Sequence, residues 1–169
     1  MRKKQILSLL AIIIAGTTLF MIHEIAKKAR SKPNATLTLL HALSLDSTAV
    51  EISFIRADTS LVIIFSSECY ICRIQLEELL ENYHNFERYN ILLLSHQGLN
   101  ELLRIQAKYN LNRFSNFQIL KMDELLTEEP FFSASNPSLF VLDHNGRLIL
   151  QRKGYTSPEL LINQLQKYQ

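Results

Sequence analysis

The chain is poor in several residue types, and each shortage narrows the classes of protein to which it can belong. Its 169 residues include two cysteines, four glycines, four prolines and no tryptophan. A structural zinc site needs four ligands, and His84 and His96 are too far apart in sequence to complete a finger with the two cysteines. Low glycine and proline with 47% apolar residues indicate an ordered protein without low-complexity tracts. The length suits one domain with a full core.

Acidic residues are scarce near the N-terminus and basic residues are concentrated there. Residues 1–36 contain seven Lys and Arg residues and one acidic residue. Residues 37–169 contain eleven Lys and Arg residues and fifteen acidic residues, a formal net charge of −4. The sequence pI of about 8.6 therefore comes from the N-terminal segment. Without that segment no excess of basic charge remains, so we expect no nucleic-acid partner.

Charged residues are absent from residues 6–22, and Arg2, Lys3 and Lys4 come just before this run. Its length is at the short end for a helix that spans a bilayer. We predict a membrane anchor over residues 1–25 that contacts the membrane through residues 6–22. A cleavable signal peptide is the alternative, although the bulky end of the run offers no small-residue cleavage site.

Basic residues flank the apolar run on both sides, so the positive-inside rule hardly distinguishes the two orientations. We favour a cytoplasmic N-terminus, because a short tail followed by a folded domain usually inserts that way. Residues 26–36 then form a linker, and residues 37–169 form a domain on the periplasmic or outer face of the inner (cytoplasmic) membrane.

A pair of cysteines follows the most apolar strand signal in the domain. Residues Leu61–Phe65 predict a buried strand, and the apolar spacing after the Cys69-Tyr70-Ile71-Cys72 motif predicts a helix to about Tyr83. The first turn of a helix has free N–H groups and the positive end of the dipole, which favour a thiolate. Cys69 and Cys72 are therefore the candidate catalytic residues of a redox site, with Cys69 as the exposed nucleophile and Cys72 as the resolving thiol.

The other apolar runs predict alternating strands and helices. An Asn-Gly pair between two runs signals a hairpin, and Ser157-Pro158 signals a helix start. The predicted elements are a strand pair at 36–45 and 49–55, a strand at 90–95, a helix from 99 to about 110, a strand at 117–120, a short helix at 123–129, a hairpin of 138–142 with 147–151, and a last helix from 158. This order predicts an α/β domain whose central mixed sheet has helices on both faces.

The motifs at residues 65–72 and 136–149, with Gly154, resemble the thioredoxin superfamily. The resemblance is closest to its membrane-anchored TlpA-like branch of the redoxin (AhpC/TSA) type, and it covers about residues 36–169. It implies a thioredoxin-like fold and a thiol-disulfide oxidoreductase with no cofactor and no metal. The implied partners are a protein disulfide substrate and a thiol electron donor.

The resemblance also implies a substrate-binding surface beside the dithiol. Pro137 matches the family's cis-proline, whose backbone edge faces the cysteines and can pair with a substrate peptide. Asn136, Tyr70 and Ile71 complete this predicted surface. The chain departs from the family at Glu68, where tryptophan is common, and a carboxylate there opposes thiolate formation. We therefore expect a reductant of protein disulfides.

Two further departures and two alternative functions follow from the same motifs. Ile63 lies where thioredoxins have a buried acidic residue, and Asn136 replaces the threonine or valine that is commoner before the family's proline.

A peroxiredoxin-like peroxidase is one alternative function, with Ser66 as its hydroxyl residue, but Val62 stands where that motif needs proline. A copper chaperone of related fold is the other, with His144 as a third ligand beside the two thiolates.

Overall fold

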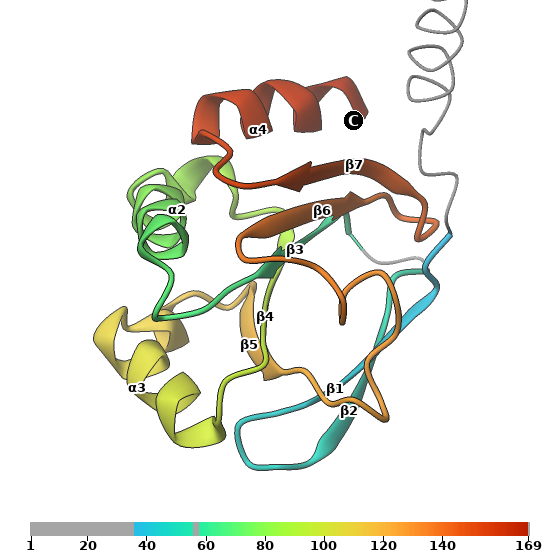
Figure 1. Ribbon diagram of the computed structural model, residues 1–169. Helices are drawn as coiled ribbons and strands as arrows, with labels where there is room; N and C mark the ends of the chain where they lie inside the picture. Colours follow the sequence, from blue (N-terminus) through green and yellow to red (C-terminus); the bar gives the residue numbers. More distant parts are fainter. Residues whose placement is uncertain (1–35, 56–57, 169) are drawn as a thin grey trace, which may run out of the picture. The chain divides into compact units, whose positions relative to one another are not determined.

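The computed structural model describes residues 36–55 and 58–168, and within them seven strands form one mixed sheet (Figure 1). The strands are β1 (Leu39–Leu43), β2 (Ala49–Ser53), β3 (Ser60–Ile64), β4 (Asn90–Ser95), β5 (Phe117–Lys121), β6 (Ser138–Leu142) and β7 (Leu148–Lys153). The α-helices are α2 (Tyr70–Glu81), α3 (Leu99–Lys108) and α4 (Pro158–Leu165), with 3-10 turns at Tyr83–Asn85, Leu111–Arg113 and Gln166–Tyr168.

The strand order is β2-β1-β5-β4-β3-β6-β7. Strands β3, β4 and β5 are parallel, and the other neighbouring pairs are antiparallel. Every residue of β3 and β6 is buried, because these strands lie inside the sheet and both their faces are covered. The predicted α/β mixed sheet, the N-terminal strand pair and the β6–β7 hairpin are confirmed.

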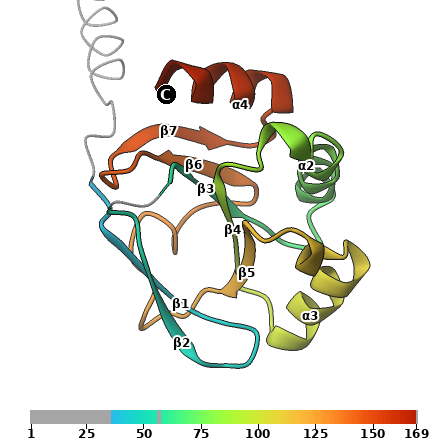
Figure 2. The ribbon, with the colours of Figure 1, turned by 180° about the vertical axis from the view of Figure 1, so that it is seen from behind.

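All three described α-helices pack on one face of the sheet, so the predicted arrangement with helices on both faces is wrong. Leu61, Ile63 and Phe65 share a buried cluster with side chains of α2, α3 and α4. The chain moves from β3 to β4 to β5 in one direction across the sheet, and right-handed crossovers then place α2 and α3 on the same side. Figure 2 shows these two helices together, opposite the long loop that joins β5 to β6.

That loop covers the other face of the sheet. Phe131 is fully buried and packs edge-on against Phe140, in a second cluster that also contains Val62 and Ile64. The predicted helix at 123–129 is wrong, because these residues form turns. The Asp123 side chain accepts a hydrogen bond from the Leu125 N–H, and Thr127 Oγ1 accepts one from the Asp123 N–H. Such local bonds compete with helix formation in a segment this short.

Two predicted turn signals are confirmed. Ser157 caps α4 and its hydroxyl accepts a hydrogen bond from the Leu160 N–H. Gly146 in the β6–β7 turn has φ +71°, and a Cβ atom there would collide with the Leu37 carbonyl oxygen. The backbone N–H of Leu37 donates to the Gly146 carbonyl over 2.7 Å, so glycine is needed both for conformation and for this close approach.

None of the helices in the described residues is long and apolar enough to cross a membrane. The anchor predicted at residues 1–25 lies outside the described residues, as does nearly all of the linker predicted at 26–36.

His41 on β1 joins the sheet to the β5–β6 loop. Its Nδ1 atom lies against the Glu128 carboxylate, its backbone N–H donates to Glu128 over 3.0 Å, and its Nε2 atom lies 3.0 Å from Glu51. The hydrogen bond with Glu128, then that with Glu51, raises the pKa of His41 above its ordinary 6.5. A raised folded-state pKa stabilises the protein fully below the unfolded pKa and less as the pH rises through the folded value.

We expect the thermal stability of the wild type, relative to His41→Gln, to fall as the pH rises from about 6 to about 8. The effect should be small because the side chain is partly exposed to solvent. Thermal unfolding of the full-length chain across this pH range measures it. His144→Gln is the matched control, because His144 lies on an exposed turn and bonds Asn145. An unchanged difference between wild type and His41→Gln across the range would contradict this role.

Candidate functional site

Strand β3 delivers the cysteine pair to the start of α2. Phe65 continues the strand and donates to the Leu94 carbonyl over 2.8 Å, and the chain then turns at residues 66–68. Cys69 is the N-cap of α2, where its sulfur accepts a hydrogen bond from the Cys72 N–H over 3.1 Å. The predicted position of the dithiol, between a buried strand and a helix, is confirmed.

The two sulfurs form a disulfide, with the Cα atoms of Cys69 and Cys72 5.2 Å apart. Cys72 is 1% exposed and belongs to the apolar cluster beneath α2, whereas Cys69 is partly exposed. After reduction, a Cys69 thiolate would face the free N–H groups and the positive dipole end of α2. Cys69 is thus the cysteine of the pair that a partner can reach, and Cys72 is the buried one.

Exposed apolar surface adjoins the reachable sulfur. Tyr70 is 65% exposed and Ile71 is 41% exposed, although both belong to the first turn of a packed helix. The guanidinium of Arg73 lies 5.6 Å from the centre of the Tyr70 ring. These side chains give the cysteine pair a hydrophobic border with one cationic group.

The register of the sheet brings Pro137 to the end of the fold at which the two cysteines lie. The Asn136-Pro137 bond is cis, as the resemblance implied. Ser138, the next residue, pairs with Ile64 at the end of β3 that leads to Cys69. The Pro137 carbonyl accepts the Gly154 N–H over 2.8 Å, which fixes the backbone here, while the Asn136 side chain is exposed. A second cis bond, Glu129-Pro130 in the β5–β6 loop, was not predicted.

His144 lies at the opposite end of the sheet from the cysteines. It follows Leu142, which pairs with Ser60 at the start of β3, whereas Cys69 follows the end of that strand. The five-residue length of β3 corresponds to about 15 Å, so His144 cannot join the two thiolates as a ligand. In the part of the chain that the structure describes, no group of three His, Cys, Asp or Glu side chains is placed to hold a metal ion. The copper-chaperone alternative thus loses its proposed third ligand.

Gln75 is a buried polar residue of α2 that the sequence did not single out. It is 2% exposed, and its amide donates to the Thr156 carbonyl over 2.8 Å and accepts the Thr156 N–H over 2.7 Å. This pair of bonds joins α2 to the segment between β7 and α4, next to Gly154. The available signal was a polar residue between Cys72 and Leu76 on the buried face of the helix.

No model of a protein family matches the chain, and no curated protein sequence matches it either. Solved structures do match. An exposed lipoprotein thioredoxin of Streptococcus pneumoniae is 18% identical, with 76% of this chain and 98% of that one covered and a TM-score of 0.57. The thioredoxin domain of a thiol-disulfide oxidoreductase of Bacteroides vulgatus is 15% identical, with 80% and 96% covered and a TM-score of 0.61. The chain has a thioredoxin-like fold.

This fold hosts more than one thiol chemistry. A peroxiredoxin-like protein of Aquifex aeolicus is 11% identical to the chain, with 76% of this chain and 82% of that one covered and a TM-score of 0.58. Oxidoreductases and a peroxiredoxin-like protein thus share the backbone arrangement of this thioredoxin-like chain to a similar degree. The function must therefore be argued from the residues of the site.

Proposed function

We propose that the chain is a thiol-disulfide oxidoreductase that reduces protein disulfides through Cys69 and Cys72. The observation that carries this proposal is the bonded cysteine pair at the start of α2, in which Cys72 is buried and Cys69 is partly exposed. Tyr70 and Ile71 beside the exposed sulfur provide an apolar surface for a polypeptide. At the same end of the sheet, the exposed Asn136 beside the buried Pro137 is the proposed backbone edge for that substrate.

The proposed reaction moves two electrons and two protons from the dithiol to the substrate. The Cys69 thiolate attacks one sulfur of the substrate disulfide, that S–S bond breaks, and the departing substrate sulfur takes a proton. Cys72 loses its proton and attacks the Cys69 sulfur of the mixed disulfide, which releases the second substrate sulfur as a thiol. The chain is left with the Cys69–Cys72 disulfide, and an external thiol donor restores the dithiol by the reverse exchange.

We propose reduction as the physiological direction because the residues directly before and between the two cysteines do not stabilise a thiolate. A strong oxidant needs a heavily stabilised thiolate, whereas Tyr70 and Ile71 supply no charge and Glu68 places an exposed carboxylate next to Cys69. The reduction potential of the pair tests the direction. A value as oxidising as that of the strongest bacterial oxidases, about −120 mV, would reverse it.

A peroxiredoxin-like peroxidase is the second candidate, because a peroxiredoxin-like protein shares the fold. Val62, where that chemistry needs proline, is buried inside β3. The deciding experiment mixes the reduced full-length chain with a disulfide-bonded protein or with hydrogen peroxide and measures thiol loss. We expect the protein disulfide to oxidise Cys69 and Cys72 at least about a hundredfold faster than peroxide at equal concentration. Faster reaction with peroxide would replace the proposal with the alternative.

We also propose that residues 6–22 tether the domain to the inner (cytoplasmic) membrane, with the domain on the periplasmic or outer side. The uncharged apolar run after Arg2-Lys3-Lys4 supports this. Disulfide substrates are abundant outside the cytoplasm, which fits the proposed chemistry. Protease added to intact spheroplasts would digest the domain if this orientation is correct, and would leave it intact if the domain is cytoplasmic.

A further inference from the structure

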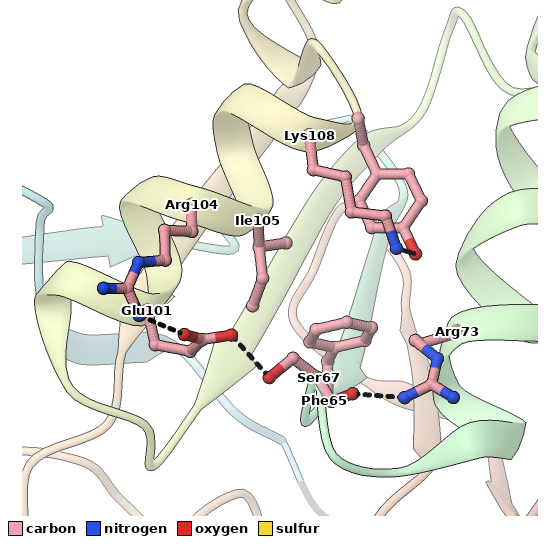
Figure 3. Close-up of a pocket in the computed structure, with 8 residues that line it drawn as sticks. Phe65, Ser67, Arg73, Glu101, Arg104, Ile105 and Lys108 are labelled. Carbon is pink, nitrogen blue, oxygen red and sulfur yellow. Dashed lines mark hydrogen bonds and ion pairs between the residues drawn. The ribbon is translucent and has the colours of Figure 1, made fainter.

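A cleft of about 330 Å³ lies beside the start of α2, between this helix and α3. Figure 3 shows its lining: Arg73 comes from α2, whereas Glu101, Arg104, Ile105 and Lys108 come from α3, and Phe65 and Ser67 lie between the helices. Tyr109 completes the lining. Phe65 and Ile105 are buried, so the cleft has an apolar floor with charged groups around it. Two of the lining residues are near the cysteines in sequence: Ser67 comes two residues before Cys69, and Arg73 directly follows Cys72.

Positive charge exceeds negative charge in this cleft. Its lining includes three cationic side chains and one carboxylate, that of Glu101. Both oxygens of this carboxylate are engaged: one accepts the Ser67 hydroxyl over 2.8 Å, and the other lies 3.3 Å from the Arg104 guanidinium. The bond from Ser67, then that from Arg104, lowers the pKa of Glu101, which is therefore ionised at neutral pH. The carboxylate thus balances one of the three cations.

The two other cations keep unused hydrogen-bond donors. Arg73 donates once, to the Ser67 carbonyl over 2.7 Å, although a guanidinium has five N–H groups. Lys108 donates to the Tyr109 hydroxyl over 3.2 Å, and that hydroxyl in turn donates to Glu77. Among the described residues, neither Arg73 nor Lys108 forms an ion pair. A carboxylate is the group that best matches such a pair of cations, because it can bind a guanidinium through both oxygens.

We propose that this cleft binds an acidic side chain located within a few residues of the target cysteine in the substrate. The inference rests on the proposed function and specifies its substrate class, namely disulfides flanked by Asp or Glu. The rest of the domain would repel an acidic substrate, because residues 37–169 carry a formal net charge of −4. The overall charge alone predicts faster reaction with basic peptides, whereas the cleft predicts faster reaction with acidic ones.

Synthetic peptides with one internal disulfide separate these two predictions. Three peptides differ only at the positions that flank one cysteine, which hold Glu, Gln or Lys, and the reduced full-length chain reduces each under the same conditions. We expect the Glu peptide to react about tenfold faster than the Lys peptide. This is the factor expected when two partly exposed cations, Arg73 and Lys108, each contact the Glu carboxylate. The ratio should approach one when the salt concentration rises from about 0.01 M to about 1 M, because the Debye length then falls from about 30 Å to about 3 Å.

Charge reversal identifies the cleft as the source of the preference. In Arg73→Glu/Lys108→Glu, which reverses the two cations without an ion pair, the Glu-to-Lys rate ratio should fall below one. The matched control is Arg88→Glu/Arg113→Glu, which changes the net charge equally at two exposed residues that precede β4 and β5 and so lie at the other end of the sheet. This control should keep a ratio above one.

The outcomes distinguish the inference from the proposed function. A wild-type ratio of one or less at low salt, or equal ratios in the two double variants, would overturn the cleft as a carboxylate site while leaving disulfide reduction intact. If the wild type fails to reduce even the Gln peptide, the proposed function fails and this inference fails with it. The salt series needs no variant, so it tests the preference even if a double variant does not fold.

Discussion

Replacing Cys69 by serine is expected to lower the rate of protein-disulfide reduction at least about a thousandfold. The serine hydroxyl is not ionised at neutral pH and cannot exchange with a disulfide, whereas the partly exposed Cys69 sulfur accepts the Cys72 N–H at the start of α2. The rate of thiol release from a disulfide-bonded protein measures the loss. Far-ultraviolet circular dichroism of the full-length variant checks that the fold is retained.

The neighbouring serine supplies the control for this variant. Ser66→Ala should retain the rate within about threefold, because the Ser66 hydroxyl accepts only a long bond of 3.3 Å from the Glu68 N–H. A peroxidase would instead use a hydroxyl at this position to orient peroxide. Substantial reductase activity in Cys69→Ser, or a selective loss of thiol chemistry in Ser66→Ala, would contradict the assignment.

Replacing Gln75 by alanine is expected to lower the free energy of unfolding by about 3 kcal/mol. The change removes two hydrogen bonds, leaves the Thr156 N–H and carbonyl without their partner, and opens a small cavity under α2. Because Gly154 in the same segment holds the Pro137 carbonyl, we also expect weaker substrate binding. Urea denaturation of the full-length chain measures the stability.

Gln118→Ala is the matched control for this substitution. Gln118 lies on β5 with an exposed side chain, and its loss should change the unfolding free energy by less than about 0.5 kcal/mol. Equal effects of the two substitutions would show that the bonds between α2 and the β7–α4 segment do not stabilise the fold.

The sequence predicted those parts of the fold that local chemistry controls. Five consecutive apolar residues after Ser60 required a buried strand, the Ser-Pro pair required a helix start, and the Asn-Gly pair required a turn. The position of the cysteines at a helix N-terminus followed from the same local rules. Each of these features depends on residues that are close together in the sequence, so no knowledge of the tertiary structure was needed.

The features that were missed depend on residues far apart in the sequence. The alternation of strands and helices predicted helices on both faces of the sheet, but the direction of the β3-β4-β5 path decides on which face each helix lies. Gln75 finds its partner 81 residues away. The cleft joins Arg73 of α2 to Lys108 of α3, and no local pattern marks such a pair. Periodicity alone also cannot distinguish the turns at 123–129 from a short helix.

Trapping with Cys72→Ser tests the central claim most directly. Without the resolving thiol, Cys69 should attack a substrate disulfide and remain linked to it, and mass spectrometry of the full-length variant should locate the link on Cys69. The account predicts one stable mixed disulfide per chain, absent from Cys69→Ser/Cys72→Ser. If no such adduct forms while the variant is folded and its Cys69 thiol is reduced, Cys69 is not the residue that exchanges with disulfides.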